Sequence, residues 1–163
     1  MPISAFPRVS LTHLPTPLEP LERLSNYLGG PEIYIKRDDC TGLATGGNKA
    51  RKLEYLMADA LRQGADTVVT AGAVQSNHVR QTAAAASRLG LTCHALLEQE
   101  VPCDEPSYTD SANVLLNSLF DCQVEYCAAG ADLPVRLRAR ARELRNQGHK
   151  PYLIPVGGSN AVG

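Results

Sequence analysis

The strongest constraint on the fold is an alternation of short apolar segments with longer segments of helical period. Residues 50–61 place apolar side chains three and four positions apart, the spacing of one helix face. Residues 67–71, Thr-Val-Val-Thr-Ala, form an apolar run typical of a strand buried on both faces. We expect Gly64 to end the helix and Gly72 to end the strand. Such alternation predicts a parallel sheet with right-handed crossovers.

The same alternation continues almost to the end of the chain. Further helices are predicted at 75–89, 110–120 and 133–147, and further strands at 93–97, 123–127 and 152–156. In the last helix, the side chains expected to face inward are Leu133, Leu137, Ala141 and Leu144. The fold class is therefore α/β, an open, twisted parallel sheet with flanking helices. Ligands of such sheets bind beyond the carboxyl ends of the strands, so the loops at 72–78 and 157–160 are predicted to line one cleft.

The first 47 residues follow a different pattern. Five prolines precede residue 21, which is typical of an extended arm with turns. A short helix is expected at 18–28, ending at Gly29, and a strand at 32–37. At the other end, no helix follows the glycine-rich loop at 157–160, so we expect a truncated fold.

Charge and composition exclude several classes of partner. The 163 residues carry a formal net charge of −1, which gives no reason to expect nucleic acid or an anionic membrane. The chain has no tryptophan, so a base-stacking platform is not expected. No apolar run approaches the ~18 residues of a membrane span, and the first residues lack the apolar core of a signal peptide. We therefore expect a cytoplasmic protein.

The cysteines indicate neither a disulfide framework nor a metal site. There are five, an odd number, and no Cys-x-x-Cys pair occurs. No histidine or second pair completes a zinc set around Cys122 and Cys127. We expect buried free thiols and no bound metal.

Residues 45–52, Thr-Gly-Gly-Asn-Lys-Ala-Arg-Lys, hold the first candidate for chemistry. Glycines let a backbone approach a ligand closely, and the helix that follows offers unpaired N–H groups and a positive dipole end. Lys49, Arg51 and Lys52 therefore stand at the wrong end for helix stability, which points to an anion or a reactive amine. Lys49 is the catalytic candidate, because a lysine amine forms a Schiff base with an aldehyde. The alternative is a surface lysine in a basic turn.

Ser76, Asn77 and His78 form the second candidate, since they open a helix directly after a strand. Backbone N–H groups at such a place can hold a carboxylate or a phosphate. Ser76 or Asn77 can equally be an ordinary N-cap, and His78 a plain first-turn residue. The chain has no Gly-x-Ser-x-Gly elbow, and its glycine-rich stretches match neither the dinucleotide fingerprint nor the P-loop.

Four ordered segments together resemble one enzyme family. They are Lys-Arg-Asp-Asp at 36–39, Gly-Gly-Asn-Lys-Ala-Arg-Lys-Leu-Glu at 46–54, Ala-Val-Gln-Ser-Asn-His-Val-Arg-Gln at 73–81 and Ile-Pro-Val-Gly-Gly-Ser-Asn at 154–160. On these motifs the chain resembles the D-cysteine desulfhydrase and 1-aminocyclopropane-1-carboxylate deaminase family. These are pyridoxal-phosphate enzymes of the tryptophan-synthase-β fold type.

The resemblance implies a role for each candidate residue. Lys49 would hold pyridoxal phosphate covalently and move the substrate's α-proton, and Lys52 would lie near the cofactor phosphate. Asn77 would bond the 3-oxygen of the cofactor. Ser76 would lie near the substrate carboxylate, and in the deaminase branch it acts as a nucleophile. Ser76, Asn77 and His78 together would bind a small amino acid.

The resemblance also implies a division of the chain. Residues 1–47 would be an arm and strand of the larger domain, residues 48–157 the smaller α/β domain, and residues 158–163 the start of the return into the larger domain. The match covers about half of a typical family member, and the family suggests a homodimer.

The implied reaction is β-elimination by a carbon–sulfur lyase. D-Cysteine would give pyruvate, sulfide and ammonia, or L-cysteate would give pyruvate, sulfite and ammonia. His78-Val79 and the Gly-Gly-Ser loop at 157–159 favour this branch, because the deaminase branch tends to have Gln-Thr and Gly-Cys-Ser there. The alternatives are the deaminase activity and an inactive α/β fragment.

Overall fold

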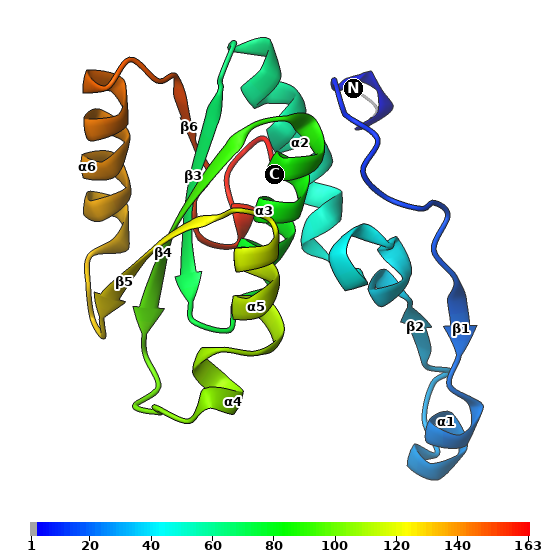
Figure 1. The fold of residues 1–163 in the computed structure, drawn as a ribbon. Helices are drawn as coiled ribbons and strands as arrows, with labels where there is room; N and C mark the ends of the chain where they lie inside the picture. The colour runs from blue at the N-terminus through cyan, green and yellow to red at the C-terminus, as the bar shows by residue number, and fades with distance from the viewer. Residues whose placement is uncertain (1–2) are drawn as a thin grey trace.

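The computed structural model describes residues 3–163, so Met1 and Pro2 of the predicted arm lie outside the described residues. Its centre is a parallel sheet of four strands in the order β5-β4-β3-β6 (Figure 1). These strands are β3 (Thr67–Ala73), β4 (Thr92–Gln99), β5 (Gln123–Ala128) and β6 (Pro151–Leu153). The predicted α/β class with a parallel sheet is confirmed.

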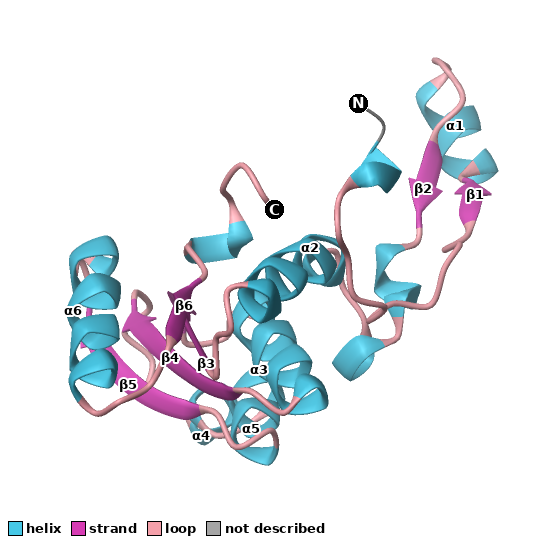
Figure 2. Cartoon of the chain, turned by 90° about the horizontal axis from the view of Figure 1, so that it is seen from above, coloured by secondary structure: helices cyan, strands magenta, loops and turns pink. Residues whose placement is uncertain are grey.

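The helices cover both faces of this sheet. Helices α2 (Lys49–Arg62), α3 (Asn77–Leu89) and α5 (Ala112–Leu119) lie on one face, and α6 (Leu133–Asn146) lies on the other (Figure 2). The single turn α4 (Pro106–Thr109) precedes α5. From β3 the chain runs outward through β4 to β5, and α6 then carries it back to β6 on the other side of β3. The strand order therefore reverses between β3 and β6.

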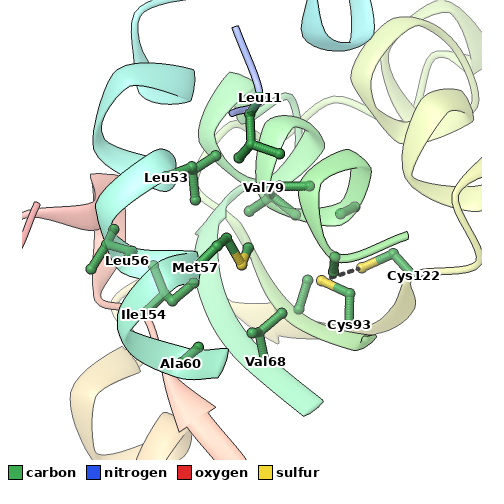
Figure 3. Packing of buried hydrophobic residues seen from close by; sticks show 14 of the residues in the cluster. Leu11, Leu53, Leu56, Met57, Ala60, Val68, Val79, Cys93, Cys122 and Ile154 are labelled. Atoms are coloured by element: carbon green, nitrogen blue, oxygen red, sulfur yellow. Dashed lines mark hydrogen bonds between the residues drawn. The ribbon is translucent and has the colours of Figure 1, made fainter. Parts of the chain in front are cut away.

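A separate apolar core fills each face of the sheet. Because successive side chains of a strand point to opposite faces, Val68 joins the core under α2 and α3, whereas Val69 joins the core under α6. Figure 3 shows Leu53 and Met57 of α2 packed beside Val79 of α3 in the first core. The second core contains three of the four inward side chains predicted for 133–147, namely Leu133, Leu137 and Leu144. The fourth, Ala141, is also fully buried.

The N-terminal arm forms a small unit of its own. Strands β1 (Leu18–Pro20) and β2 (Tyr34–Lys36) pair antiparallel, and α1 (Glu22–Leu28) joins them. In Figures 1 and 2 this unit lies apart from the parallel sheet. Helix α1 buries none of its residues.

Two residues of α2 fasten the arm to the rest of the fold. Glu54 is buried and accepts hydrogen bonds from the backbone N–H groups of Leu11 and Thr12, both at 3.0 Å. Arg51 donates to Asp38 Oδ1 at 2.7 Å and to Thr16 Oγ1 at 2.7 Å. From the sequence, Arg51 was one of three cations expected to bind an anion or to activate a reactive amine. In the structure, its hydrogen bonds fasten the arm to α2.

Two predicted element boundaries are wrong at a proline and a glycine. Residues 18–20 form a strand, not the start of a helix, because Pro20 suits an edge strand and would disrupt a helix interior. The helix ends at Gly29 as predicted. Strand β3 continues through Gly72 to Ala73. A Cβ at Gly72 would lie 2.5 Å from Ser76 Oγ, so this glycine admits the next turn and does not end the strand.

The helix predicted at 110–120 is interrupted. Asp110 is not helical, and the segment divides into α4 and α5. The side chain of Gln75 shapes the break, since its Nε2 donates to the carbonyls of Tyr108 and Ser111 and its Oε1 accepts from the N–H of Asn113. In addition, Leu61, expected on the inward face of α2, is 39% exposed.

All five cysteines are free, as predicted, but not all are buried. Cys93, Cys122 and Cys127 are buried, whereas Cys40 lies exposed in a surface turn and Cys103 is partly exposed. Over residues 3–163, no three histidine, cysteine or acidic side chains gather as a metal site would require. None of the helices in this described part has the length and apolarity needed to cross a membrane.

Candidate functional site

The loops that follow β3 and β6 meet where the strand order reverses. The β3 loop leads into α3, and the β6 loop contains the short turn Val156–Gly158. A Cβ at Gly158 would lie 3.6 Å from His78 Cε1, so the β6 loop lies against the first turn of α3. In open α/β sheets this is the position where ligands bind.

Two lysines of the first turn of α2 reach the β6 loop. Lys49 is the first residue of the helix, and its Cε lies 3.7 Å from where a Cβ of Gly157 would be. Lys52 Nζ donates to the Gly157 carbonyl at 3.2 Å and to Ser159 Oγ at 2.9 Å. The two amines therefore converge on one glycine-rich turn.

The first turn of α3 faces the same region. Ser76 is the N-cap of α3, and its Oγ accepts from the Val79 N–H at 3.3 Å, so it has the ordinary capping role that the sequence left open. Asn77 is exposed, and its Nδ2 donates to Asn48 Oδ1 at 3.4 Å. Four of the predicted site residues, Lys49, Lys52, Ser76 and Asn77, thus lie on two helix N-termini that meet each other.

His78 lies beneath this region and does not face solvent. Its side chain is buried, and Nε2 lies 2.8 Å from Thr70 Oγ1. Burial lowers the pKa of His78 to about 4, and the charges of Lys49 and Lys52 act in the same direction. The Pro155 carbonyl opposes this shift, but Nδ1 has no hydrogen bond of ordinary geometry. His78 is therefore neutral at pH 7, and its ring packs beside Gly158 of the β6 loop.

The buried histidine makes stability depend on pH. Its pKa is lower in the folded than in the unfolded state, so between pH 6.5 and about 4 the unfolded chain binds the extra proton. We expect the free energy of unfolding to fall as the pH drops through this window, by at most about 1.4 kcal/mol per pH unit. Urea denaturation at several pH values measures the slope. His78→Gln should flatten it, and an unchanged slope in that variant would contradict the assignment.

Two polar residues of α3 that were not predicted as site residues also contact the backbone of residues 46–49, at the start of α2. Arg80 donates to the Gly46 carbonyl at 2.6 Å and to Asn113 Oδ1 at 3.0 Å. Gln81 is buried and its Oε1 accepts from the Lys49 N–H at 3.1 Å. The sequence signal that could have identified Gln81 is its position, because it follows Asn77 by one helical turn on the same face of α3.

Comparison with known proteins identifies the family of this chain. The family profile described as pyridoxal-phosphate dependent enzyme matches residues 9–163. The chain belongs to this family. It is 60% identical over 161 residues to the D-cysteine desulfhydrase of Serratia proteamaculans and 57% identical to that of Salmonella paratyphi B. The alignments cover 99% of this chain but 48% and 49% of the two relatives, so the chain spans about half the length of the curated relatives it matches.

Two solved structures share the fold. A crystal structure described as the ACC deaminase homologue superposes with a TM-score of 0.87 at 41% identity, over 98% of this chain and 47% of that one. The diaminopropionate ammonia lyase of Escherichia coli superposes with a TM-score of 0.61 at 19% identity, over 85% of this chain and 40% of that one. The second likeness concerns the fold alone.

The residues present fit the pyridoxal phosphate on which the family depends. Lys49 offers a primary amine to an aldehyde, and its side chain lies against Gly157, where the absence of a Cβ leaves room. Lys52 offers a cation to a phosphate, and Asn77 offers an exposed amide to an oxygen. The positive end of α3 adds a favourable field for an anion.

Proposed function

We propose that this chain carries the lysine-bearing half of a pyridoxal-phosphate-dependent carbon–sulfur lyase. The substrate would be a small sulfur-containing amino acid, with D-cysteine giving pyruvate, sulfide and ammonia; L-cysteate, giving sulfite, is the alternative leaving-group chemistry. The observation that carries the proposal is that Lys49 of α2 lies against the β6 loop to which Lys52 also donates, in a chain 60% identical to a D-cysteine desulfhydrase.

Each residue of the site would contribute a separate part. Pyridoxal phosphate, when bound, supplies an acceptor for the electron pair left at the substrate α-carbon. Lys49 would hold the cofactor through its amine, and the same amine would take the α-proton of the substrate. Lys52 would pair with the cofactor phosphate, and Asn77 would bond its ring oxygen. Ser76 and the first N–H groups of α3 would orient the substrate carboxylate.

A deaminase acting on 1-aminocyclopropane-1-carboxylate is the second candidate function. The similarity to a structure described as an ACC deaminase homologue favours it. Identity to that structure is 41%, however, against 60% to the desulfhydrase, and we rank the lyase first for that reason.

Covalent capture of the cofactor tests the proposal. We expect the 163-residue chain mixed with pyridoxal phosphate to show the visible band of a lysine-bound cofactor. Borohydride reduction should then leave a stable adduct on the peptide that contains Lys49. Lys49→Ala should lose both signals, and Lys150→Ala, a lysine far from the site, should keep them. An equal adduct in Lys49→Ala would show that Lys49 is not the attachment point.

Release of the 2-oxo acid distinguishes the substrates. D-Cysteine, L-cysteate and 1-aminocyclopropane-1-carboxylate are compared under identical conditions. Faster turnover of D-cysteine is expected, and equal turnover of all three would contradict the branch we favour.

We also propose the division of the chain implied by the family. Residues 1–47 and 158–163 would belong to a larger domain, and residues 48–157 would form the smaller one. The exposed apolar side chains of the arm support this division, because a larger domain would cover them. They are Leu18, Leu24, Tyr27, Leu28, Tyr34 and Ile35. A protein of the relatives' length should be a homodimer, which light scattering would check, and a monomer would contradict this.

A reducing compartment suits the thiols, and we place the protein in the cytoplasm. Cys122 Sγ donates a hydrogen bond to Cys93 Sγ at 3.5 Å in the core, and the two thiols form no disulfide (Figure 3). Thiols that close would oxidise readily in an oxidising compartment. Cell fractionation would check the location, and recovery outside the cytoplasm would contradict it.

A further inference from the structure

The N-terminus of α2 lacks a cap from its own chain neighbours. Asn48 stands at the N-cap position with helical angles, φ −66° and ψ −26°, and makes no side-chain capping bond. Gln81 of α3 takes that role from outside. Its Oε1 accepts from the Lys49 N–H at 3.1 Å, and its Nε2 donates to the Gly47 carbonyl at 3.3 Å. One amide group therefore holds both sides of the junction from which Lys49 extends.

The fit between Gln81 and this junction is close. Gln81 is fully buried, and a Cβ at Gly47 would lie 2.8 Å from its Oε1. Gly47 has φ +139°, a conformation that suits glycine. The amide thus occupies the space where a side chain at residue 47 would lie.

The helix that carries Gln81 also carries Asn77, one turn earlier on the same face. The Nδ2 of Asn77 donates to Asn48 Oδ1 at 3.4 Å. Consecutive residues of the α2 start, Asn48 and Lys49, are therefore held by consecutive turns of α3. The separation between the Lys49 amine and the Asn77 amide depends on this double contact.

We propose that Gln81 is a positioning residue for Lys49. It fixes the backbone from which the lysine side chain leaves, and so sets where the amine meets a cofactor bonded by Asn77. This inference rests on the proposed function of Lys49 and Asn77. Gln81 makes its contacts with the backbone of residues 47 and 49, so its effect is transmitted through Lys49.

Amide hydrogen exchange tests the hold on the backbone without any cofactor. Gln81→Met preserves length and apolar bulk but removes the acceptor, so the Lys49 amide should exchange about fivefold faster or more, the loss expected for one hydrogen bond. Gln81→Glu keeps an acceptor oxygen and should retain most of the protection. Thr82→Val is the matched control, because Thr82 is also fully buried on α3 but bonds only the His78 carbonyl of its own helix.

Capture of pyridoxal phosphate tests the consequence for chemistry. The rate of borohydride-trapped adduct formation at Lys49 should fall about fivefold or more in Gln81→Met and stay near the wild-type value in Thr82→Val. Unchanged exchange at Lys49 in Gln81→Met, or equal slowing of capture in both variants, would overturn the inference. If the wild-type chain forms no adduct at Lys49, the proposed function fails, and the exchange rates still decide whether Gln81 holds the Lys49 backbone.

Discussion

Gly46→Ala is expected to lower the free energy of unfolding by about 4 kcal/mol, near the upper end for single substitutions. Gly46 has φ +77° and ψ 178°, a region that is essentially restricted to glycine. A Cβ there would lie 1.8 Å from the Asp39 carbonyl oxygen, so the backbone of one segment must move. Urea denaturation followed by circular dichroism measures the loss.

Gly90→Ala is the matched control for this prediction. Gly90 ends α3 with φ +71°, and nothing lies within 4 Å of where its Cβ would be. Alanine there meets only the left-handed backbone penalty of about 1 kcal/mol. Losses of equal size at the two glycines would show that the contact with Asp39 does not matter. Because Gly46 precedes Lys49 by three residues, Gly46→Ala should also reduce covalent capture of pyridoxal phosphate.

Glu54→Ala is expected to lower the free energy of unfolding by about 3 kcal/mol, because it leaves buried groups without partners. The N–H groups of Leu11 and Thr12 would lose their acceptor, and Arg8 would lose its carboxylate at 2.5 Å. Burial raises the pKa of Glu54, but hydrogen bonds from Thr12 and Leu11, together with the charge of Arg8, outweigh it and hold the pKa below its usual value. The carboxylate is thus ionised at pH 7, where it accepts these hydrogen bonds and pairs with Arg8.

The location of the damage distinguishes this anchor from a general loss of stability. In Glu54→Ala, limited proteolysis should cut the arm before residue 48 while the parallel sheet stays protected. Glu54→Gln keeps an acceptor oxygen and should lose less. Glu143→Gln removes an exposed ion pair with Arg140 and should cost about 0.5 kcal/mol or less. Cleavage spread evenly over the chain in Glu54→Ala would contradict the anchoring role.

Features of the fold that depend on periodicity could be predicted from the sequence. The inward face of α6 follows from apolar residues three and four positions apart, and all four predicted side chains are buried. The parallel sheet follows from strands that alternate with helices. The lysines and the start of α3 could be singled out because cations and polar groups at a helix N-terminus need a reason to be there.

Features that depend on one side chain contacting a distant backbone could not be predicted. Gln75 and Gln81 read as ordinary polar residues, and their roles appear only once α3 lies beside residues 47–49 and 108–113. Arg51 likewise looked like part of a basic cluster, and its partner Asp38 comes from the arm. Local sequence carries no information about these pairings, because they depend on how elements pack.

The pairing of β6 with β3 has a consequence for the timing of biosynthesis. Lys52 bonds Gly157 and Ser159, which lie 105 and 107 positions further along the chain. A nascent chain emerging from the ribosome can form β3, β4 and β5 in order, since each packs on the strand before it. At that stage the loop after β6, which contacts the lysines in the folded protein, is not yet synthesised, and β6 has not yet paired with β3. Until then the Lys52 amine lacks both of its acceptors, and the Lys49 side chain lacks the glycine-rich turn against which it lies.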